Sequence, residues 1–556
     1  MPPQKSARFQ PSDIVDFVIV GSGAAGGILA KELSTAGFQV VVLEQGPRLT
    51  EADFTHDEFG VFSQYRHTNS LFTQPQTFRA TANDEAKKSL PLTYGRLVGG
   101  SNAHFTANFW RLHPSDFNEA SRLGGVPGTG LADWPITYEE LEPYYSKAEW
   151  ELGVSGEPGP FDAPRSRPYP MPPLPVKSSG VLMERGARAL GLHPQPTPMA
   201  INSQPYNGRL ACQQCGFCYF FMCEYGAKST SMVAMLPLAE ATGRCEIRPN
   251  SYVARVEMNP QGRATGVTYF DSQKRLQRQR AKAVILSANG AETARLLLNS
   301  ESSRFPNGLA NSSGLVGKHL MFNTYYSVHA QFEHPLNEYK GVQNTRMVHD
   351  FYDTDPKRGF YGGGGIDARF GDYPISFALD GLPPETPQWG ETFARELADK
   401  FTRTMAFAAH GTSLPLESNS ITLDPQLKDA WGLPCMRVTY KDHPDDMKNK
   451  AFFRDRALEL IDAAGAVKKW ADPVREERAM GHTMGGCRMG NDPKTSVVDK
   501  FHRAHDVPNL YVVDGSSFVT SARNHPTCTI SALAYRAADN IIKNAKNGSI
   551  KSPTGA

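Results

Sequence analysis

Near the N-terminus, apolar residues form short runs that are separated by a glycine turn. Residues 16–20 predict a buried strand, 28–36 an amphipathic helix and 39–43 a second strand. This order is the βαβ unit of an α/β protein. The same kind of pattern later in the chain predicts two more strands and two more helices, at 283–287, 509–513, 292–299 and 529–544.

A second pattern covers residues 320–475, where aromatic and β-branched residues alternate with polar ones. The alternation in YYSVHAQF, MAFAAHG, SITLD and MRVTYK predicts an antiparallel sheet. Residues 246–256 and 263–271 are typical of a smaller antiparallel element. We expect 50–95 to be irregular and 158–175 to be a proline-rich loop.

Length and composition limit the class of protein. A chain of 556 residues is too long for one ordinary core, so we expect two domains. A net charge of +2 gives no electrostatic reason to expect nucleic acid or an anionic membrane as a partner. No apolar run reaches the about 18 residues that cross a bilayer. The first segment, MPPQKSARFQPSD, lacks the apolar core of a secretory signal.

The glycine turn after the first strand has the spacing G-x-G-x-x-G, formed by Gly21, Gly23 and Gly26. The first glycine permits the turn, the second lets a pyrophosphate approach the backbone, and the third lets the helix pack closely. Glu44 ends the second strand and is placed to accept a hydrogen bond from an adenosine ribose. We therefore expect a dinucleotide at the helix N-terminus. The motif does not distinguish NAD from FAD, and a glycine-rich turn of an unrelated α/β protein is the competing interpretation.

Four of the eight cysteines lie close together, with the spacing C-x2-C-x2-C-x4-C: Cys212, Cys215, Cys218 and Cys223. This spacing is close to that of bacterial ferredoxins, and it predicts an iron–sulfur cluster, which needs soft thiolates around a compact centre. Zinc usually takes two separated knuckles, and disulfides need an oxidising compartment. Zinc, disulfides and free thiols remain the alternatives.

Several longer segments resemble the glucose–methanol–choline (GMC) oxidoreductase family. Besides the glycine motif they are GRLVGGSNAHFTANFWR, HTMGGCRMG, NLYVVDGSSF and HPTCTISALAYRAADNI, in the family's order along the chain. The resemblance implies an α/β fold with a Rossmann-type FAD-binding domain, built from discontinuous segments, and a substrate domain with an antiparallel sheet. The expected bounds are 12–160, 226–318 and 476–546 for the FAD-binding domain, 161–225 for a cysteine-rich insert and 319–475 for the substrate-binding domain.

The resemblance also implies positions around FAD. Asp514 would lie near the ribityl chain and diphosphate, and the backbone of Val253 would hold the adenine. In relatives that bind FAD covalently, the attached histidine stands four residues after the second glycine of a GG pair. Gly100 and His104 have this spacing. His104 is therefore expected either to bond FAD covalently or to line the flavin.

Alcohol oxidation needs a base that takes the hydroxyl proton while the flavin takes the hydride, and histidine suits this near neutral pH. By resemblance, His482 is that base and His525 is the hydrogen-bond partner of the substrate oxygen. Asn524 is a competing assignment that lies one residue out of register. Asn108 and Trp110 are further candidates near the flavin. The aromatic residues Tyr325, Tyr326, Phe407 and Trp389 are candidates to stack on a sugar face, and the alternative is that most of them belong to the core of the sheet.

The cysteine segment, CQQCGFCYFFMCEYGAKST, resembles the insert of a dehydrogenase branch of the family. That branch includes the large subunits of gluconate 2-dehydrogenase, glucoside 3-dehydrogenase and FAD-dependent glucose dehydrogenase. Some members hold a three-iron four-sulfide (3Fe-4S) cluster on three cysteines. The resemblance implies a carbohydrate substrate, a small subunit and a cytochrome c acceptor. It also implies a periplasmic location through a signal on the small subunit, with the cytoplasm as the alternative.

These observations predict an FAD-dependent dehydrogenase that oxidises a hydroxyl of a sugar, glycoside or sugar acid. Position 3 of a glycoside is the first expectation, and position 2 of gluconate is the second. The electrons would leave through the iron–sulfur cluster. The alternatives are an oxygen-using oxidase of the same family, a flavin-binding subunit without catalysis, and a nicotinamide-dependent reductase. The last leaves the cysteines and the C-terminal segments unexplained.

Overall fold

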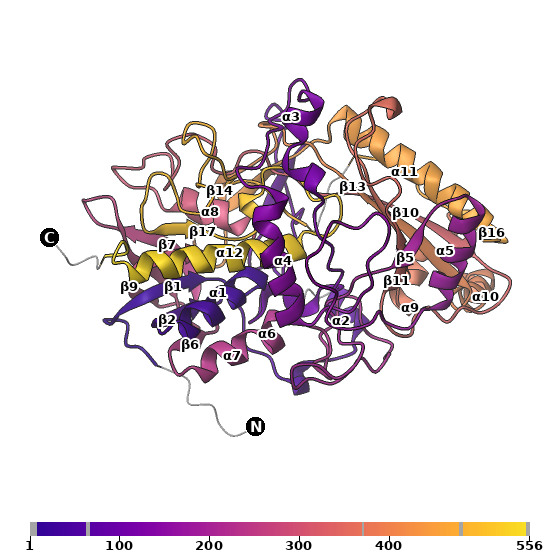
Figure 1. Ribbon diagram of the computed structural model, residues 1–556, viewed down its shortest axis with the longest axis horizontal. Helices are drawn as coiled ribbons and strands as arrows, with labels where there is room; N and C mark the ends of the chain where they lie inside the picture. The colour runs from indigo at the N-terminus through magenta and orange to yellow at the C-terminus, as the bar shows by residue number, and fades with distance from the viewer. Residues whose placement is uncertain (1–7, 63–66, 370–371, 477–481, 552–556) are drawn as a thin grey trace.

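The computed structural model describes residues 8–62, 67–369, 372–476 and 482–551. The start of the chain, where no secretory signal is expected, and small parts of the segments 50–95 and 476–546 lie outside the described residues. Two halves lie side by side along the long axis of the molecule (Figure 1). Each half contains a large β-sheet with its own helices.

The first sheet carries the N-terminal βαβ unit. Its order is β6-β2-β1-β9-β8-β7, and β17 pairs with the C-terminal half of β9. Strands β6, β2, β1, β9 and β17 are parallel, whereas β7 and β8 add an antiparallel extension. These strands are β1 (Ile14–Val20), β2 (Val40–Leu43), β6 (Cys245–Arg248), β7 (Tyr252–Met258), β8 (Ala264–Phe270), β9 (Leu276–Leu286) and β17 (Leu510–Val512).

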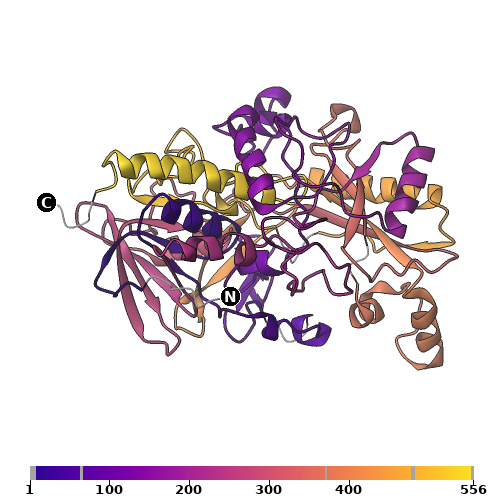
Figure 2. The same cartoon turned by 60° about the horizontal axis from the view of Figure 1, so that its bottom comes forward.

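Helices from both ends of the chain cover this sheet. Helix α1 (Ala24–Thr35) packs against α7 (Leu236–Ala241) and α12 (Thr527–Lys546), and α12 packs against α4 (Tyr138–Leu152). Figure 2 shows α1 and α12 on one side of the fanned strands. Since the central parallel strands are buried on both faces, their sequences are almost continuously apolar. The C-terminal helix therefore completes a core that the N-terminal unit begins.

The second sheet is wholly antiparallel, with the order β16-β10-β13-β12-β11-β5. Its strands are β5 (Pro194–Pro196), β10 (Thr324–Gln331), β11 (Asn344–Val348), β12 (Gly364–Arg369), β13 (Thr404–Gly411) and β16 (Lys468–Trp470). Helices α5 (Ser178–Ala189) and α11 (Pro444–Ala463) bury apolar side chains against one face of it. The predicted fold class, a parallel sheet from discontinuous segments plus an antiparallel sheet, is confirmed.

A third sheet joins strands that are far apart in sequence, in the order β14-β15-β3-β4. Its strands are β3 (Gln76–Arg79), β4 (Lys87–Ser89), β14 (Ser420–Lys428) and β15 (Pro434–Thr439). The prediction that SITLD and MRVTYK belong to the large antiparallel sheet was wrong, because these two strands pair with each other and β15 pairs in parallel with β3. Alternation identifies a strand but not its partner.

Two further expectations need correction. The segment 50–95 is not wholly irregular, since it contains β3, β4 and the short helix α2 (Glu58–Phe62). The segment 246–256 is not one strand, because Asn250 has a positive φ of 52° and the chain turns there, from β6 into β7. Only β7 joins the antiparallel extension with β8.

The elements not yet named are helices and single-turn segments. The helices are α3 (Glu119–Leu123), α6 (Ser231–Ala234), α8 (Glu292–Asn299), α9 (Pro374–Ser376) and α10 (Gly390–Lys400). The single-turn 3-10 and π segments are η1 (Glu51–Asp53), η2 (Gly100–His104), η3 (Pro114–Phe117), η4 (Pro356–Arg358), η5 (Phe377–Gly381) and η6 (Gly515–Ser517).

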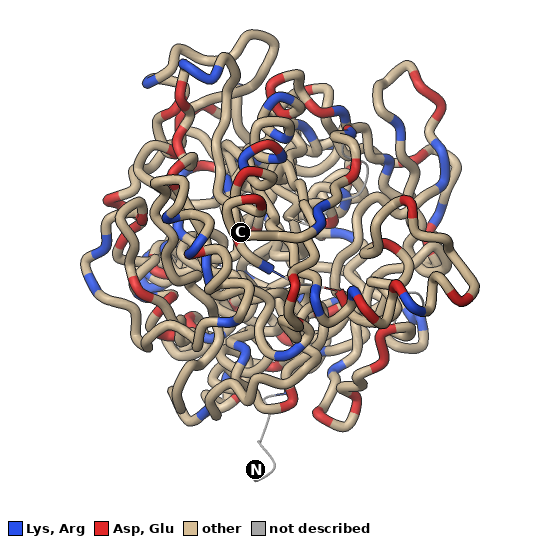
Figure 3. Tube along the Cα trace, turned by 90° about the vertical axis from the view of Figure 1, so that its right-hand side faces the viewer, with Lys and Arg blue, Asp and Glu red and all other residues tan. Residues whose placement is uncertain are grey.

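Charged residues of both signs are interspersed over the side of the molecule that Figure 3 shows, in keeping with the small net charge. Among the described residues, none of the helices has the length and apolar character needed to cross a bilayer.

Candidate active site

One cavity of about 790 Å³ extends from the glycine turn after β1 to the two C-terminal histidines. Its lining contains nine of the residues that the sequence singled out for cofactor or catalysis, namely Gly21, Gly23, Glu44, Gly100, His104, Val253, Asp514, His482 and His525. Gly26 lies outside the lining, as do the alternative candidates Trp110 and Asn524. We call the glycine side the cofactor end and the histidine side the substrate end.

The three glycines of the turn have different surroundings. A Cβ on Gly21 would lie 2.3 Å from the carbonyl oxygen of Ser287, and a Cβ on Gly26 would lie 2.1 Å from that of Gly21. At Gly23 the nearest atom to such a Cβ is the carbonyl oxygen of Gly99, at 3.9 Å. Gly21 and Gly26 therefore allow close packing of the backbone, whereas Gly23 keeps space free.

Helix α1 begins at Ala24 without a side-chain cap and without an acidic residue in its first turn. Its first amide groups and its dipole thus remain available for an anion. Glu44 lies beside them, and its carboxylate accepts hydrogen bonds from Ser22 Oγ (2.7 Å), from the Ser22 amide (3.1 Å) and from the Gly46 amide (3.0 Å). Burial raises the pKa of Glu44. This arrangement fits the diphosphate and ribose of a dinucleotide.

The GG pair packs directly on the dinucleotide turn. A Cβ on Gly100, which has φ +54°, would lie 3.3 Å from the Cα of Gly23. The following turn, η2, ends at His104, which is buried and lines the cavity. Burial lowers the pKa of His104 to about 4, and its Nε2 atom has no partner among the described residues. A neutral imidazole with a free nitrogen fits either a contact or a bond with the flavin ring.

Asp514 and Val253 enter the cavity from two strands of the first sheet. Asp514 follows β17, and its carboxylate accepts hydrogen bonds from Ser516 (amide 2.8 Å, Oγ 2.6 Å) and from Thr293 Oγ1 (2.6 Å). Burial raises the pKa of Asp514. Val253 lies on β7, whose backbone reaches the cavity edge beside Ser251 and Tyr252.

At the substrate end, three histidine rings lie against one another. The centroids of His482 and His525 are 4.9 Å apart, and His410 on β13 lies 4.5 Å from His525 and 6.1 Å from His482. The Asn108 side-chain amide nitrogen lies 2.9 Å from Nε2 of His525, and Nδ1 of that ring has no partner among the described residues. Trp110 packs edge-on against His525 at 5.0 Å.

The environment keeps these imidazoles neutral. Burial, together with the smaller effect of the neighbouring Arg369 charge, lowers the pKa of His482 to about 4. The pKa values of His525 and His410 also lie well below the usual range. Burial is the main cause, and the Arg369 charge and the neighbouring histidines lower both values in the same direction. A neutral imidazole can accept a proton, so the pair His482 and His525 can take a hydroxyl proton and hold the oxygen.

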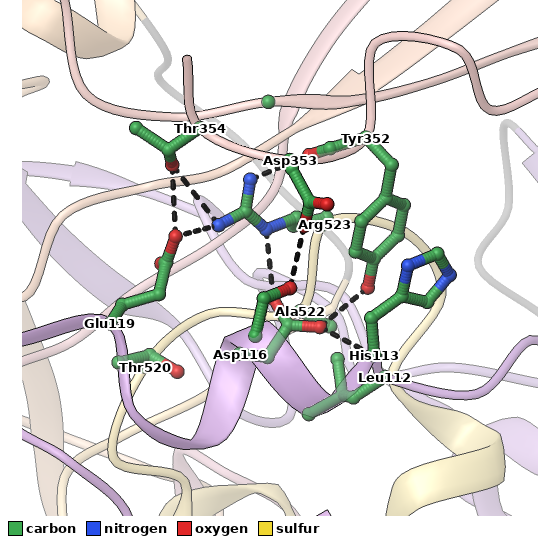
Figure 4. A network of polar contacts seen from close by, with 12 residues as sticks. Leu112, His113, Asp116, Glu119, Tyr352, Asp353, Thr354, Thr520, Ala522 and Arg523 are labelled. Atoms are coloured by element: carbon green, nitrogen blue, oxygen red, sulfur yellow. Dashed lines mark hydrogen bonds and ion pairs between the residues drawn. The ribbon is translucent and has the colours of Figure 1, made fainter. Parts of the chain in front are cut away.

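A buried arginine anchors the segment that carries His525. Arg523 is completely buried, and its Nε donates to Asp116 (2.8 Å) while Nη1 donates to the Tyr352 carbonyl (2.6 Å). Its Nη2 is paired with Glu119 and also donates to Thr354 Oγ1. Figure 4 shows this arginine enclosed by the network, with Tyr352 donating to Asp116 and Thr354 to Glu119. Arg523, two positions before His525, is therefore held by partners from both the N-terminal and the C-terminal half of the chain.

The neighbouring Asn524 points to a different partner. Its amide nitrogen lies 3.1 Å from Nε2 of His349, and it does not contribute to the cavity lining, whereas His525 does. This placement favours His525 over Asn524 as the second residue of the pair.

The aromatic candidates have different positions. Tyr325 and Asn108 line the cavity, whereas Tyr326 and Phe407 are buried in the core of the second sheet. Trp389 is 84% exposed. Sequence reasoning missed His410 and Arg369, which line the substrate end. The available signal was their polar character within strands whose residues are all buried.

The four cysteines are free thiols that line one small cavity of about 20 Å³. Phe217 lines the same cavity, whereas the next residues of the loop, Tyr219 and Phe220, line the large one. Lys228 secures the loop by donating to the carbonyls of Cys218 (2.7 Å) and Phe221 (2.8 Å). In the described part of the chain, no three His, Cys, Asp or Glu side chains converge on a point that suits a single metal ion.

Comparison with known proteins adds the family. Two family models described as GMC oxidoreductase match this chain, one over residues 15–323 and the other over residues 415–534. The chain belongs to the GMC oxidoreductase family. Three relatives are the 2-methyl-1,2-propanediol dehydrogenase of Mycolicibacterium austroafricanum (35% identical, 95% of each chain), the fructose dehydrogenase large subunit of Gluconobacter japonicus (31%, 96% of this chain and 98% of that one) and the gluconate 2-dehydrogenase flavoprotein of Pantoea cypripedii (31%, 95% and 93%).

A solved structure of a formate oxidase variant from Aspergillus oryzae has the same fold, with a TM-score of 0.69 at 15% identity over 98% of this chain and 100% of that one. Membership of the GMC oxidoreductases makes the protein an FAD-dependent enzyme that oxidises CH–OH groups. The large cavity, with its glycine turn, free helix N-terminus and buried Glu44, fits FAD. Its relatives include both dehydrogenases and oxidases.

Proposed function

We propose that this GMC oxidoreductase is a dehydrogenase that oxidises a secondary hydroxyl of a sugar, glycoside or sugar acid, with position 3 of a glycoside first. Bound FAD supplies the hydride acceptor. Neutral His482 takes the hydroxyl proton, and His525, held by Asn108, binds the substrate oxygen. Trp110 packs behind His525 and keeps water from that side of the ring.

The proposal includes an iron–sulfur cluster on the cysteine loop, with a 3Fe-4S type expected, and it places the protein in the cysteine-rich dehydrogenase branch. The observation that carries it is the shared loop: Cys212, Cys215, Cys218 and Cys223 surround one cavity, and Tyr219 and Phe220 line the other. A cluster would accept electrons singly at this wall. A cavity of about 20 Å³ holds about one water, so the thiols must spread when a cluster is built.

Metal and sulfide analysis of anaerobically purified protein tests this part. We expect iron and acid-labile sulfide in nearly equal amounts, with an electron paramagnetic resonance signal in the oxidised state. A variant with all four cysteines changed to serine is the matched control and should contain neither. Zinc without sulfide, or no metal, would contradict the cluster.

A substrate panel tests the reaction. Sugars, glycosides, gluconate and short diols are assayed with an artificial dye and with oxygen, and the oxidised position is read by NMR. We expect dye reduction to exceed peroxide formation at least tenfold. Comparable peroxide formation would instead make the protein an oxidase, the kind of activity named for its 31% identical relative, paromamine 6'-oxidase of Streptomyces fradiae.

His104 is proposed to contact the flavin ring, and acid denaturation decides whether this contact is a covalent bond. Yellow protein pellets would indicate the bond, whereas yellow supernatants would reject it.

A small subunit, a cytochrome c acceptor and a periplasmic location through the partner's signal also belong to the proposal. The fructose dehydrogenase relative is a large subunit, which supports a partner subunit. Affinity capture of the chain from its native cells should recover a haem protein.

A further inference from the structure

Arg369 carries a permanent positive charge at the substrate end of the cavity. It ends β12, is buried, and lines the cavity beside His410, His482 and Tyr325. Its Nε and Nη2 atoms are both paired with the carboxylate of Asp367, two residues earlier on the same strand. Asp367 is fully buried and is not part of the lining. The pair therefore presents the arginine to the cavity and keeps the carboxylate behind it.

The guanidinium has donors to spare. Its Nη2 lies 2.9 Å from Nε2 of His410. A guanidinium can only donate, so this nitrogen of His410 is the acceptor, and the neutral ring carries its proton on Nδ1. Within the described part of the chain, Nη1 of Arg369 makes no hydrogen bond. Two N–H groups of Nη1 are thus available to a molecule in the cavity.

The positive charge of Arg369 is already compensated before a substrate enters. Asp367 neutralises it, and burial keeps the three histidines uncharged near neutral pH. Apart from Arg369, the histidines and the tyrosines, the ionisable residues of the described lining are three acids at the cofactor end, namely Glu44, Glu292 and Asp514. A carboxylate at the substrate end would lose its hydration and find no unpaired cation among the described lining residues in return.

We propose that Arg369 is a specificity-determining residue: Nη1 donates to a hydroxyl of an uncharged polyhydroxy substrate, and Asp367 makes the site reject substrates that carry a carboxylate. The proposal rests on the proposed function and narrows it, because it favours sugars and glycosides over sugar acids. Arg369 acts as a fixed hydrogen-bond donor, and Asp367 brings the net charge of the ion pair to zero.

A matched pair of substrates tests the inference. Methyl glucoside and methyl glucuronide differ in one group, a CH2OH in the first and a carboxylate in the second. We expect the wild type to favour the glucoside at least tenfold in kcat/KM. Asp367→Asn leaves Arg369 uncompensated, so the ratio should shift toward the glucuronide by about 10-fold to 100-fold, the range of a hydrogen bond to a charged group.

A buried carboxylate elsewhere provides the control. Asp424 on β14 pairs with Arg437 at 3.0 Å and lies outside the cavity lining. Asp424→Asn should leave the ratio unchanged. Equal kcat/KM of the wild type for both substrates would overturn the inference, and so would a folded Asp367→Asn protein with the wild-type ratio. Where Asp367→Asn does not fold, Arg369→Lys decides, with a KM for the glucoside raised about tenfold expected and an unchanged KM overturning it.

Ligand binding separates this inference from the proposed function. If neither sugar is oxidised, the proposed function fails, but the flavin absorbance of the holoenzyme still reports binding. Propane-1,2-diol and lactate differ in the same CH2OH and carboxylate groups. Tighter binding of the diol supports the inference, whereas equal or tighter binding of lactate overturns it.

Discussion

The two ends of the cavity are built by different means. At the cofactor end, backbone geometry makes much of the site: glycines bring the turn, helix α1 and the GG pair into contact, and the side chains of Glu44, Asp514 and His104 complete it. At the substrate end, side chains from distant strands and loops make the site, and a buried charge network holds them. The difference suggests that substitutions at the two ends will fail differently. Substrate-end changes should affect turnover, and cofactor-end changes should affect FAD content.

The largest expected effect is at the substrate end. His482→Ala removes the proposed base, so turnover should decrease by about 10²–10⁴-fold. The flavin absorbance and the amount of bound FAD should stay at the wild-type level, because His482 is not part of the glycine turn. His193→Ala, at a half-exposed histidine paired with Asp350, is the control and should keep full turnover. Loss of FAD from His482→Ala would erase the distinction between the two ends.

The next largest effect concerns the network behind His525. Arg523→Met leaves Asp116 and Glu119 buried without their cation, which should lower the free energy of unfolding by about 3–5 kcal/mol. Denaturant unfolding of the FAD-loaded protein measures this value. Arg275→Met is the control, since Arg275 pairs with Asp271 at the surface, where solvent screens the two charges and such a pair contributes little to stability. A similar loss in both variants would mean that the network has no special role.

The cofactor end can be divided by two glycines. Gly26→Ala places a Cβ 2.1 Å from a backbone oxygen and should destabilise the fold by about 1–3 kcal/mol. Gly23→Ala has room for its Cβ and a φ of −67° that alanine accepts, so it should fold normally. It should nevertheless lose FAD, because the Cβ occupies the space for the diphosphate. Absorbance and thermal unfolding distinguish the two outcomes, and a Gly23→Ala protein that is full of FAD would refute the assignment.

The smallest effect is a change with pH. The pKa of His482 is lowered from 6.5 to about 4, so its neutral form persists as the pH falls through 6 and 5. We expect kcat/KM to stay nearly constant from pH 7 to about pH 5 and to decline only near pH 4, as the base becomes protonated. Fluorescence at each pH controls for unfolding. A decline centred at pH 6.5 or above would show that the base is not desolvated.

The same histidine affects stability with a defined sign. A lowered pKa in the folded state means that the unfolded chain binds the proton more tightly between pH 4 and 6.5. The free energy of unfolding therefore decreases as the pH falls below 6.5. The activity measurements should accordingly be made above the pH at which unfolding begins.

At the cofactor end, the glycine turn and Glu44 were predictable because their signals are local, whereas Val253, Asp514 and His104 were expected only through the family resemblance. Gly21, Gly23, Gly26 and Glu44 fall in one βαβ unit, and the spacing of glycines determines the turn. The strands near both ends and helix α8 were also predicted from short apolar runs. The partners of the strands were not predictable in this way. Strands β14 and β15 have the predicted alternation, but β14 pairs with β15, and β15 also pairs with β3. Partner choice depends on packing across the whole fold.

The substrate end was only partly predictable for the same reason. His482 and His525 stood out through the family resemblance, whereas His410 and Arg369 belong to no local motif. They meet the two C-terminal histidines only after the second sheet forms and brings β12 and β13 to the cavity. Likewise, nothing near Arg523 in the sequence shows that Asp116 and Glu119 will enclose it.

The cysteine loop has a consequence for how the holoenzyme is made. Tyr219 and Phe220 close the flavin's enclosure from the same loop that carries the thiols. Anything that settles among those thiols must then reshape the flavin's wall. If the loop holds the proposed iron–sulfur cluster, we expect assembly to be ordered, so that cells starved of iron would yield a protein poor in flavin as well.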